Sequence, residues 1–163
     1  MKHLITTLLL LTCTAAHATE KVAFFGMTKL DNSLQTKQLG ESEEEVERLA
    51  MLERIIVERF EEEGYEFVDL EPEREAIERQ VNLAKCYGCD TQIAERLGAD
   101  YSLVGEVQKV SNLILAINLQ LRDAESGDLV KGGVVDIRAN TDEGWERGIR
   151  YILKNRIFRR EEK

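Results

Sequence analysis

Histidine is almost absent from this chain. The 163 residues contain only two, His3 and His17, and both lie in the first 18 residues. If that segment is removed, no imidazole remains, which excludes the Ser-His-Asp and Cys-His types of nucleophilic catalysis. The sequence also has no glycine-rich phosphate loop, because Gly132-Gly133 falls inside a run typical of a strand. The composition therefore predicts a protein that is not an enzyme and that needs no cofactor.

Long hydrophobic runs are missing beyond the amino end. There, Lys2 precedes the apolar stretch Leu4–Leu11, and Ala16-His17-Ala18 fits the small-x-small rule of signal peptidase. This three-part pattern predicts a cleaved signal peptide over residues 1–18, and its apolar stretch is too short for a permanent membrane span. The alternative is a lipoprotein anchored at Cys13, although the residue before this cysteine suits lipidation poorly. We therefore expect an exported, periplasmic protein.

Basic residues are outnumbered by acidic ones. The chain has 22 Lys and Arg against 31 Asp and Glu, so its net charge is −9, and loss of Lys2 with the leader makes it −10. This acidity argues against nucleic acid as a partner, because phosphate backbones are bound by basic surfaces. Removal of residues 1–18 leaves 145 residues, which fits a single domain over 19–163.

The first part of the mature chain alternates strands with helices. Short apolar runs predict the strands, and apolar residues at helical spacing predict the helices. Ser42 and Glu45 match a capping box at the start of the first helix. The expected elements are a strand over 22–25, a polar loop over 27–40, a helix from Ser42 to Gly64, a strand over 65–70, a helix opening at Pro72 and running through Ala84, and a short helix between Asp90 and Gly98.

The second part shows strict alternation of apolar and polar residues in three segments. They are Tyr101–Val107, Leu113–Leu121 and Leu129–Ile137, and a final helix follows a cap at Asn140–Asp142. Such alternation predicts antiparallel strands with one face on a core. The order β-α-β-α-α-β-β-β-α predicts an α/β (α+β) fold. It has a mixed sheet of about five strands, the last three an antiparallel meander, with helices mainly on one face.

Several short phrases resemble a known type of domain. They are Lys21–Phe25, Ile93-Ala94, Leu97–Tyr101 leading into Leu103–Gly105, and Leu121–Ala124 followed by Ser126-Gly127. This series resembles the TolB amino-terminal type of domain, which envelope proteins of the curli-secretion and penicillin-binding-protein-activator kind share. The whole chain is more similar still to a family of small exported bacterial proteins of unknown function. Segments that look like that family's signatures are Cys86–Asp90, Val107–Leu113 and Asp136–Trp145. The resemblance implies a periplasmic protein–protein module without catalytic residues.

The spacing of Cys86 and Cys89 is the most distinctive local feature. In an oxidising compartment a structural disulfide is the expected role of such a pair, with thiol–disulfide chemistry and a metal or cofactor contact as alternatives. The pair precedes a helix start, where a thiolate is stabilised, but it follows a helical pattern rather than a strand. A zinc site needs four ligands, which two cysteines without histidine do not supply. We therefore predict no metal site.

The second face of the predicted meander is polar, and it is the candidate partner surface. Its members are Glu106, Gln108, Asn118, Gln120, Arg122, Asp136 and Arg138. Apolar residues such as Val134 interrupt this face, and exposed apolar residues among polar ones are typical of interfaces, whereas a solvated face is the alternative. The loop expected over 27–40 is a second candidate, because loops of that length are often functional.

These observations favour a non-catalytic binding or accessory module that recognises another periplasmic or envelope protein. One alternative is a thiol-redox or metal- and cofactor-handling accessory protein that acts through Cys86 and Cys89. A third hypothesis is an architectural role in a homo-oligomer. The aromatic and arginine residues of the last helix also fit a membrane-surface helix, although we expect Trp145 and its apolar neighbours to pack on the sheet.

Overall fold

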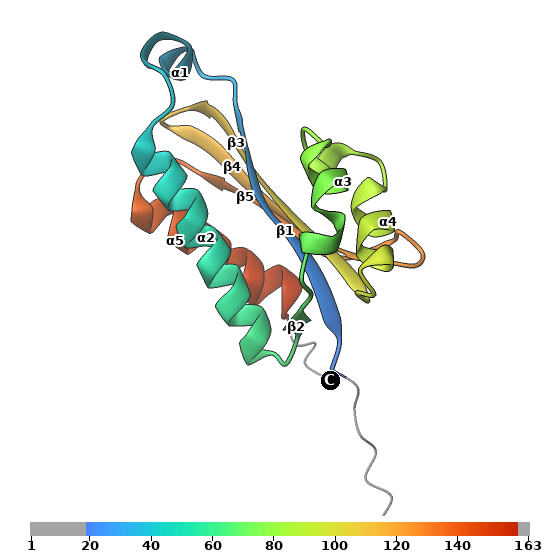
Figure 1. Ribbon diagram of the computed structural model, residues 1–163. Coiled ribbons are helices and arrows are strands. Elements are labelled where there is room, and N and C mark those ends of the chain that lie inside the picture. The colour runs from blue at the N-terminus through green and yellow to red at the C-terminus, as the bar shows by residue number, and fades with distance from the viewer. Residues whose placement is uncertain (1–18, 160–163) are drawn as a thin grey trace, which may run out of the picture.

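A mixed sheet of five strands forms the centre of the fold. The computed structural model describes residues 19–159, so the predicted signal peptide and Cys13 lie outside the described residues. In space the strands follow the order β2-β1-β3-β4-β5 (Figure 1). Their bounds are β1 Lys21–Asp31, β2 Glu66–Phe67, β3 Tyr101–Ser111, β4 Ile114–Asp123 and β5 Leu129–Ile137.

The two halves of the sheet differ in strand direction. β1 runs parallel to both of its neighbours, β2 and β3, and helices lie in the long connections that parallel pairs require. β3, β4 and β5 form an antiparallel meander joined by short turns. The predicted fold class is therefore confirmed, including the five strands and the meander at the carboxyl end.

Helices cover both faces of this sheet. α2 and α5 lie on one face, and α3 and α4 lie on the other (Figure 1). The α-helices are α1 Leu34–Leu39, α2 Glu43–Glu62, α3 Arg74–Glu78, α4 Cys89–Arg96 and α5 Asp142–Ile152. Shorter helical turns are η1 Glu71–Glu73, η2 Leu83–Lys85 and the π-helical η3 Leu153–Ile157, which continues α5. We call the face under α2 and α5 the inner face and the opposite face the outer face.

The inner face carries most of the hydrophobic core. Every second residue of β4, such as Ile117 and Leu119, is fully buried against α2 and α5. Trp145 and Ile149 of α5 are also fully buried, because their spacing places them on one side of the helix. Packing of the last helix on the sheet is thus confirmed. Each such side chain stabilises the fold by about 1.5–3 kcal/mol through removal of its surface from water.

The outer face is covered over only part of its width. Leu83 of η2, Ile93 of α4 and Val104 of β3 form a small core above β1 and β3. On the neighbouring strands the cover stops, and Val134 of β5 is 59% exposed. The fold therefore leaves the outer side of β4 and β5 open among the described residues.

The polar loop expected over 27–40 is largely regular structure. After Gly26, β1 continues to Asp31, with Met27 paired to Gly105 and Asp31 paired to Lys109. A register shift between Phe24 and Met27, with φ of +79° at Gly26, interrupts the strand without ending it. The glycine was therefore a bulge rather than a strand end, and α1 fills the rest of the expected loop.

The helix expected from Pro72 through Ala84 is also wrong in extent. Pro72 lies in η1, and α3 ends at Glu78, so the chain turns before it reaches η2. Val81, predicted on the apolar side of that helix, is almost fully exposed. The strand predicted over 65–70 shortens to Glu66–Phe67, because only its first residues pair with β1.

Candidate functional site

Five of the seven predicted partner-surface residues lie on the part of the outer face that the helices leave uncovered, and Arg138 directly follows β5. The strand register sets Gln108, Ala116 and Asp136 side by side on β3, β4 and β5. Further along β4 on the same face, Asn118 lies opposite Val134, and Gln120 lies opposite Gly132. Exposed members are Gln108, Asp136 and Arg138, and half-buried members are Asn118, Gln120 and Arg122. The antiparallel pairing thus gathers these residues on one surface, while their binding role stays a prediction.

Glu106 does not belong to this exposed surface. Its side chain is only 4% exposed, because η2 covers it. Asn82 donates a hydrogen bond of 2.7 Å to one carboxylate oxygen, and Lys85 forms an ion pair of 3.0 Å with the other. The alternation of β3 identified the face correctly, but it carried no sign of the irregular segment that packs on it. Glu106 is therefore corrected to a buried residue under η2.

Apolar side chains accompany the polar ones on the open surface. Ile114, Leu129 and Val134 are 57–59% exposed, and all three lie on β4 or β5. Large apolar side chains that stay in water contribute nothing to the core, and such residues among polar ones on one face are typical of a surface that a partner covers. We call the outer face of β4 and β5, which carries these three residues, the open face.

One end of the open face borders on the start of α4. There, Arg122 donates two hydrogen bonds, of 2.7 and 3.3 Å, to Gln120, and its Nε lies 3.9 Å from a carboxylate oxygen of Asp90. Asp90 is buried and accepts a hydrogen bond of 2.8 Å from Ser102. These contacts hold the Arg122 side chain along the sheet, so the cation is fixed in position rather than free to reach into solvent.

The cysteine pair lies next to this carboxylate. The sulfur atoms of Cys86 and Cys89 are at disulfide distance, and their Cα atoms are 5.5 Å apart. Between them, Tyr87 is fully exposed in the left-handed region, with φ of 56°. The Cys86 sulfur lies 3.8 Å from an Asp90 oxygen, and a carboxylate at that distance opposes formation of a thiolate. The contact therefore favours a structural disulfide over thiol–disulfide exchange. The structural role of the pair stays a prediction.

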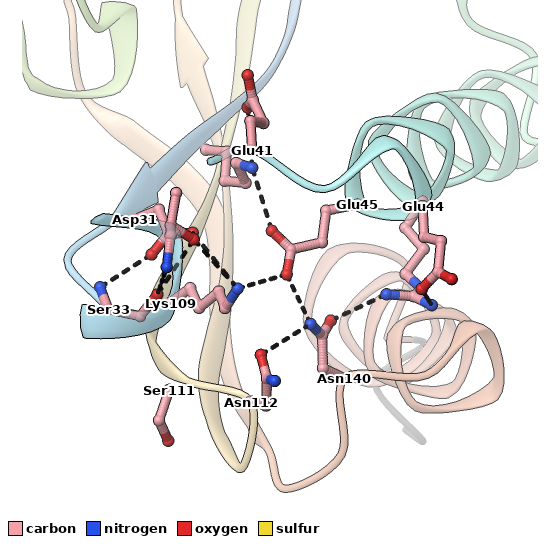
Figure 2. Close-up of polar contacts among 12 residues, drawn as sticks. Asp31, Ser33, Glu41, Glu44, Glu45, Lys109, Ser111, Asn112 and Asn140 are labelled. Atoms are coloured by element: carbon pink, nitrogen blue, oxygen red, sulfur yellow. Dashed lines mark hydrogen bonds and ion pairs between the residues drawn. The ribbon is translucent and has the colours of Figure 1, made fainter. Parts of the chain in front are cut away.

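A buried charged cluster, which the sequence did not predict, lies at the other end of the sheet beside α1 (Figure 2). Glu45 of α2 accepts hydrogen bonds from Lys109 at 2.5 Å and Asn140 at 2.7 Å, and Lys29 pairs with its second oxygen at 3.1 Å. Asp31 lies 3.4 Å from the Lys109 ammonium group. We call Lys29, Asp31, Glu45, Lys109 and Asn140 the polar cluster.

The polar cluster shifts the pKa values of its members. Burial alone would raise the pKa of Asp31, but hydrogen bonds from Ser33 and Thr36 and the charge of Lys109 outweigh it and lower that pKa to about 2. Burial likewise opposes ionisation of Glu45, yet bonds from Lys109, Asn140 and Lys29 lower its pKa. The pKa of Lys29 is raised, because its bonds to Glu41 and Glu45 outweigh the effect of burial. The charged forms of all three groups are thus favoured.

The arrangement indicates a brace rather than a reactive centre. A cleft of about 440 Å³ opens beside the cluster, lined in part by Thr36, Arg48 and Thr141. Among the described residues every buried side-chain nitrogen and oxygen atom has a hydrogen-bond partner. The same part of the chain holds no group of three or more Cys, Asp or Glu side chains placed to bind a metal ion.

Two signature segments of the sequence meet at this brace. Asn140 donates its backbone N–H to the carbonyl oxygen of Asn112, and Trp145 donates its indole N–H to the Asn140 side chain at 2.9 Å. The capping box that the sequence predicts for Ser42 and Glu45 is wrong, because Ser42 makes no side-chain cap. The alternation of β3 could have indicated this buried lysine, because Lys109 falls on the apolar side of the strand with Leu103 and Val107.

Comparison with known proteins places the chain in a family. Residues 20–157 match the family DUF3280, described as "Protein of unknown function (DUF2380)". The chain belongs to this family. Membership in a family of unknown function, which the sequence predicted, is therefore confirmed. No curated protein sequence matches the chain.

Solved structures share the fold at low sequence identity. The LpoB C-terminal domain from Salmonella enterica is 15% identical, with a TM-score of 0.52 over 76% of this chain and 86% of that one. The LpoB C-terminal domain from Escherichia coli is 14% identical, with a TM-score of 0.51 over 78% of this chain and 88% of that one. Within residues 19–159, no helix combines the length and the hydrophobicity that a bilayer crossing requires.

Proposed function

We propose that this protein is a non-catalytic binding module of the bacterial cell envelope that holds another envelope protein on its open face. The observation that carries the proposal is the open face itself. Ile114, Leu129 and Val134 remain more than half exposed there, among polar residues whose positions the sheet fixes. A rigid strand pair presents such side chains at low entropic cost, which favours specific binding of a protein surface.

Four further observations support this role. The leader pattern over residues 1–18 predicts export, and the phrases Lys21–Phe25 and Leu97–Tyr101 resemble those of envelope modules. The fold is that of the LpoB C-terminal domain. The polar cluster lies at one end of the sheet, and the disulfide turn, which Cys86 and Cys89 close, lies at the other. Both stabilise the sheet ends, which fits a scaffold that presents a surface.

The test is capture of a partner in the native periplasm. The chain is expressed with its own leader and a carboxyl-terminal tag, and proteins that co-purify at raised salt are identified by mass spectrometry. A variant with Gln120→Ala, Val134→Asp and Arg138→Ala should lose the partner, because all three changes fall on or beside the open face. A control with Val46→Asp and Arg54→Ala makes the same change of net charge on the exposed side of α2, and it should keep the partner.

Each result decides a separate point. Both variants should unfold at the same urea concentration as the parent, which shows that the fold is intact. Equal capture by the open-face variant would move the binding surface elsewhere on the molecule. A folded parent protein that retains nothing above the level of a tag-only control would contradict the binding role itself.

A further inference from the structure

β5 forms a long unpaired edge of the sheet. It is nine residues long and last in the strand order. Only β4 pairs with it, so within residues 19–159 no strand pairs with its other edge. The opposite edge is formed by β2, which has only two residues. An exposed edge strand offers a row of free backbone N–H and C=O groups that can accept another extended chain.

The outer-face side of this edge is apolar from Leu129 to Val134, and the exposed Asp136 follows on the same face. Val134 is 59% exposed and Leu129 is 58% exposed. Leu129 lies across Gly132, since a Cβ atom at that glycine would fall 3.3 Å from a methyl group of the leucine. The glycine thus lets the leucine side chain lie flat along the strand, and the two apolar residues border the edge on one side.

The inner-face side of the same edge is cationic. Lys131 is exposed beyond the end of the helical cover. Arg156 of η3 crosses Gly133 so closely that a Cβ atom there would lie 2.7 Å from Cγ of the arginine. Neither cation forms an ion pair within the part of the chain that the structure describes. In a chain of net charge −9, residues 129–159 hold seven Lys and Arg against four Asp and Glu.

These two sides specify the chemistry of an added strand. We propose that the β5 edge binds an extended segment of the partner protein as a sixth strand, with apolar and acidic residues in alternation. Because side chains of a strand alternate between faces, its apolar residues would lie beside Val134 and its acidic residues beside Lys131 and Arg156. This inference rests on the proposed binding function and names the form that the partner presents.

A synthetic peptide tests the inference directly. The probe is an end-blocked peptide of alternating valine and glutamate, about ten residues long so that it spans β5. It is titrated into the isotope-labelled protein purified from the periplasm, and amide shifts are followed by NMR. We expect saturable binding with shifts confined to β5 and adjacent residues. A peptide of the same composition with valines and glutamates in two blocks should bind about tenfold more weakly.

Charge reversal in the protein gives the second arm. Lys131→Glu with Arg156→Glu should weaken binding of the glutamate peptide by about tenfold and strengthen binding of the matching valine–lysine peptide. The control Lys37→Glu with Arg79→Glu makes the same change of net charge at exposed sites away from β5, and it should leave both affinities unchanged. Circular dichroism checks that both variants are folded.

Three outcomes would overturn the strand-addition model. They are no saturation at millimolar peptide, shifts that fall away from β5 and its adjacent residues, and unchanged affinity after N-methylation of the peptide backbone, which removes the edge hydrogen bonds. If the peptide fails while partner capture still depends on Gln120, Val134 and Arg138, the proposed function stands and the partner binds as a folded surface. If capture fails as well, both proposals fall.

Discussion

The inner and outer faces of the same sheet differ in how much of their surface helices cover. On the inner face α2 and α5 cover β1 to β5, and Leu119 and Trp145 have no exposed surface. On the outer face α4 and η2 cover β1 and β3. The paired residues Asn118 and Val134 lie on the part of that face that no helix covers. The sheet has one geometry, so the difference comes from where the helices pack.

This difference separates stability from recognition. Substitutions on the inner face change the free energy of unfolding, whereas substitutions on the open face should change partner binding alone. The polar cluster and the disulfide turn lie at the two ends of the sheet, and each ties a connecting segment to it. The experiments below break or sharpen the contrast, beginning with the largest expected effect.

Lys109→Met should produce the largest loss of stability. It removes the ammonium group that bonds Glu45 and Asp31, and it leaves carboxylates buried with fewer partners. Breaking one member out of a buried ion pair costs about 3–5 kcal/mol. Urea unfolding followed by circular dichroism measures the change. Adding Glu45→Gln should restore part of the loss, and an unchanged midpoint for Lys109→Met alone would show that the cluster does not brace the fold.

Leu119→Ala and Val134→Ala compare the two faces directly. Leu119 is fully buried on the inner face, so its truncation should lower the free energy of unfolding by about 3 kcal/mol. Val134 is more than half exposed, and its truncation should change that free energy by less than about 0.5 kcal/mol. Chemical denaturation of both variants gives the comparison. A loss at Val134 as large as that at Leu119 would mean that the open face is covered in solution.

Cys86→Ser with Cys89→Ser tests the structural disulfide at the covered part of the outer face. In the chain-entropy account, closing so short a loop stabilises the fold by about 2 kcal/mol. Urea unfolding of the double variant should show a loss of this order, with partner capture retained. Thiol labelling of the parent protein in mild glutathione buffer should find the pair oxidised, and ready reduction would instead support exchange chemistry.

Strong acid should weaken the polar cluster. The pKa of Asp31 falls from 3.8 to about 2 on folding, so its ionised form contributes stability that is complete above pH 3.8 and is lost as the pH falls toward 2. Unfolding at a series of pH values measures this dependence. Asp31→Asn should flatten the slope in that window, and an identical slope in the variant would assign the acid sensitivity to other groups.

The sequence predicted the parts of the fold that obey simple periodicity. Alternation placed Leu115, Ile117 and Leu119 on one face, and the helical spacing of Trp145 and Ile149 gave the last helix its packing side. Such patterns are local, because each element needs one apolar side to reach a core. The meander and the polar members of its outer face followed from them, but the exposure of that face did not. Alternation also placed Leu129 with Val135 and Ile137, whereas a register shift pairs it with Arg122 on the outer face.

The errors occurred where one residue type has two uses. Gly26 is compatible with both a strand end and a bulge, and Glu45 fits both a helix cap and a buried ion pair. Glu106 alternated correctly, yet its cover by η2 depends on a segment without periodicity. Which role such a residue takes depends on contacts with residues distant in the chain, such as Lys109 for Glu45. Local spacing carries no information about these contacts.

The long sequence separations within the polar cluster also bear on the order of folding. Glu45 bonds Lys109 and Asn140, which follow it by 64 and 95 residues. Closing such distances costs chain entropy before the contacts form, so non-local contacts slow the passage to the native state. The brace should therefore assemble after the meander and α5, which makes it a late step that retards unfolding rather than a nucleus that speeds folding.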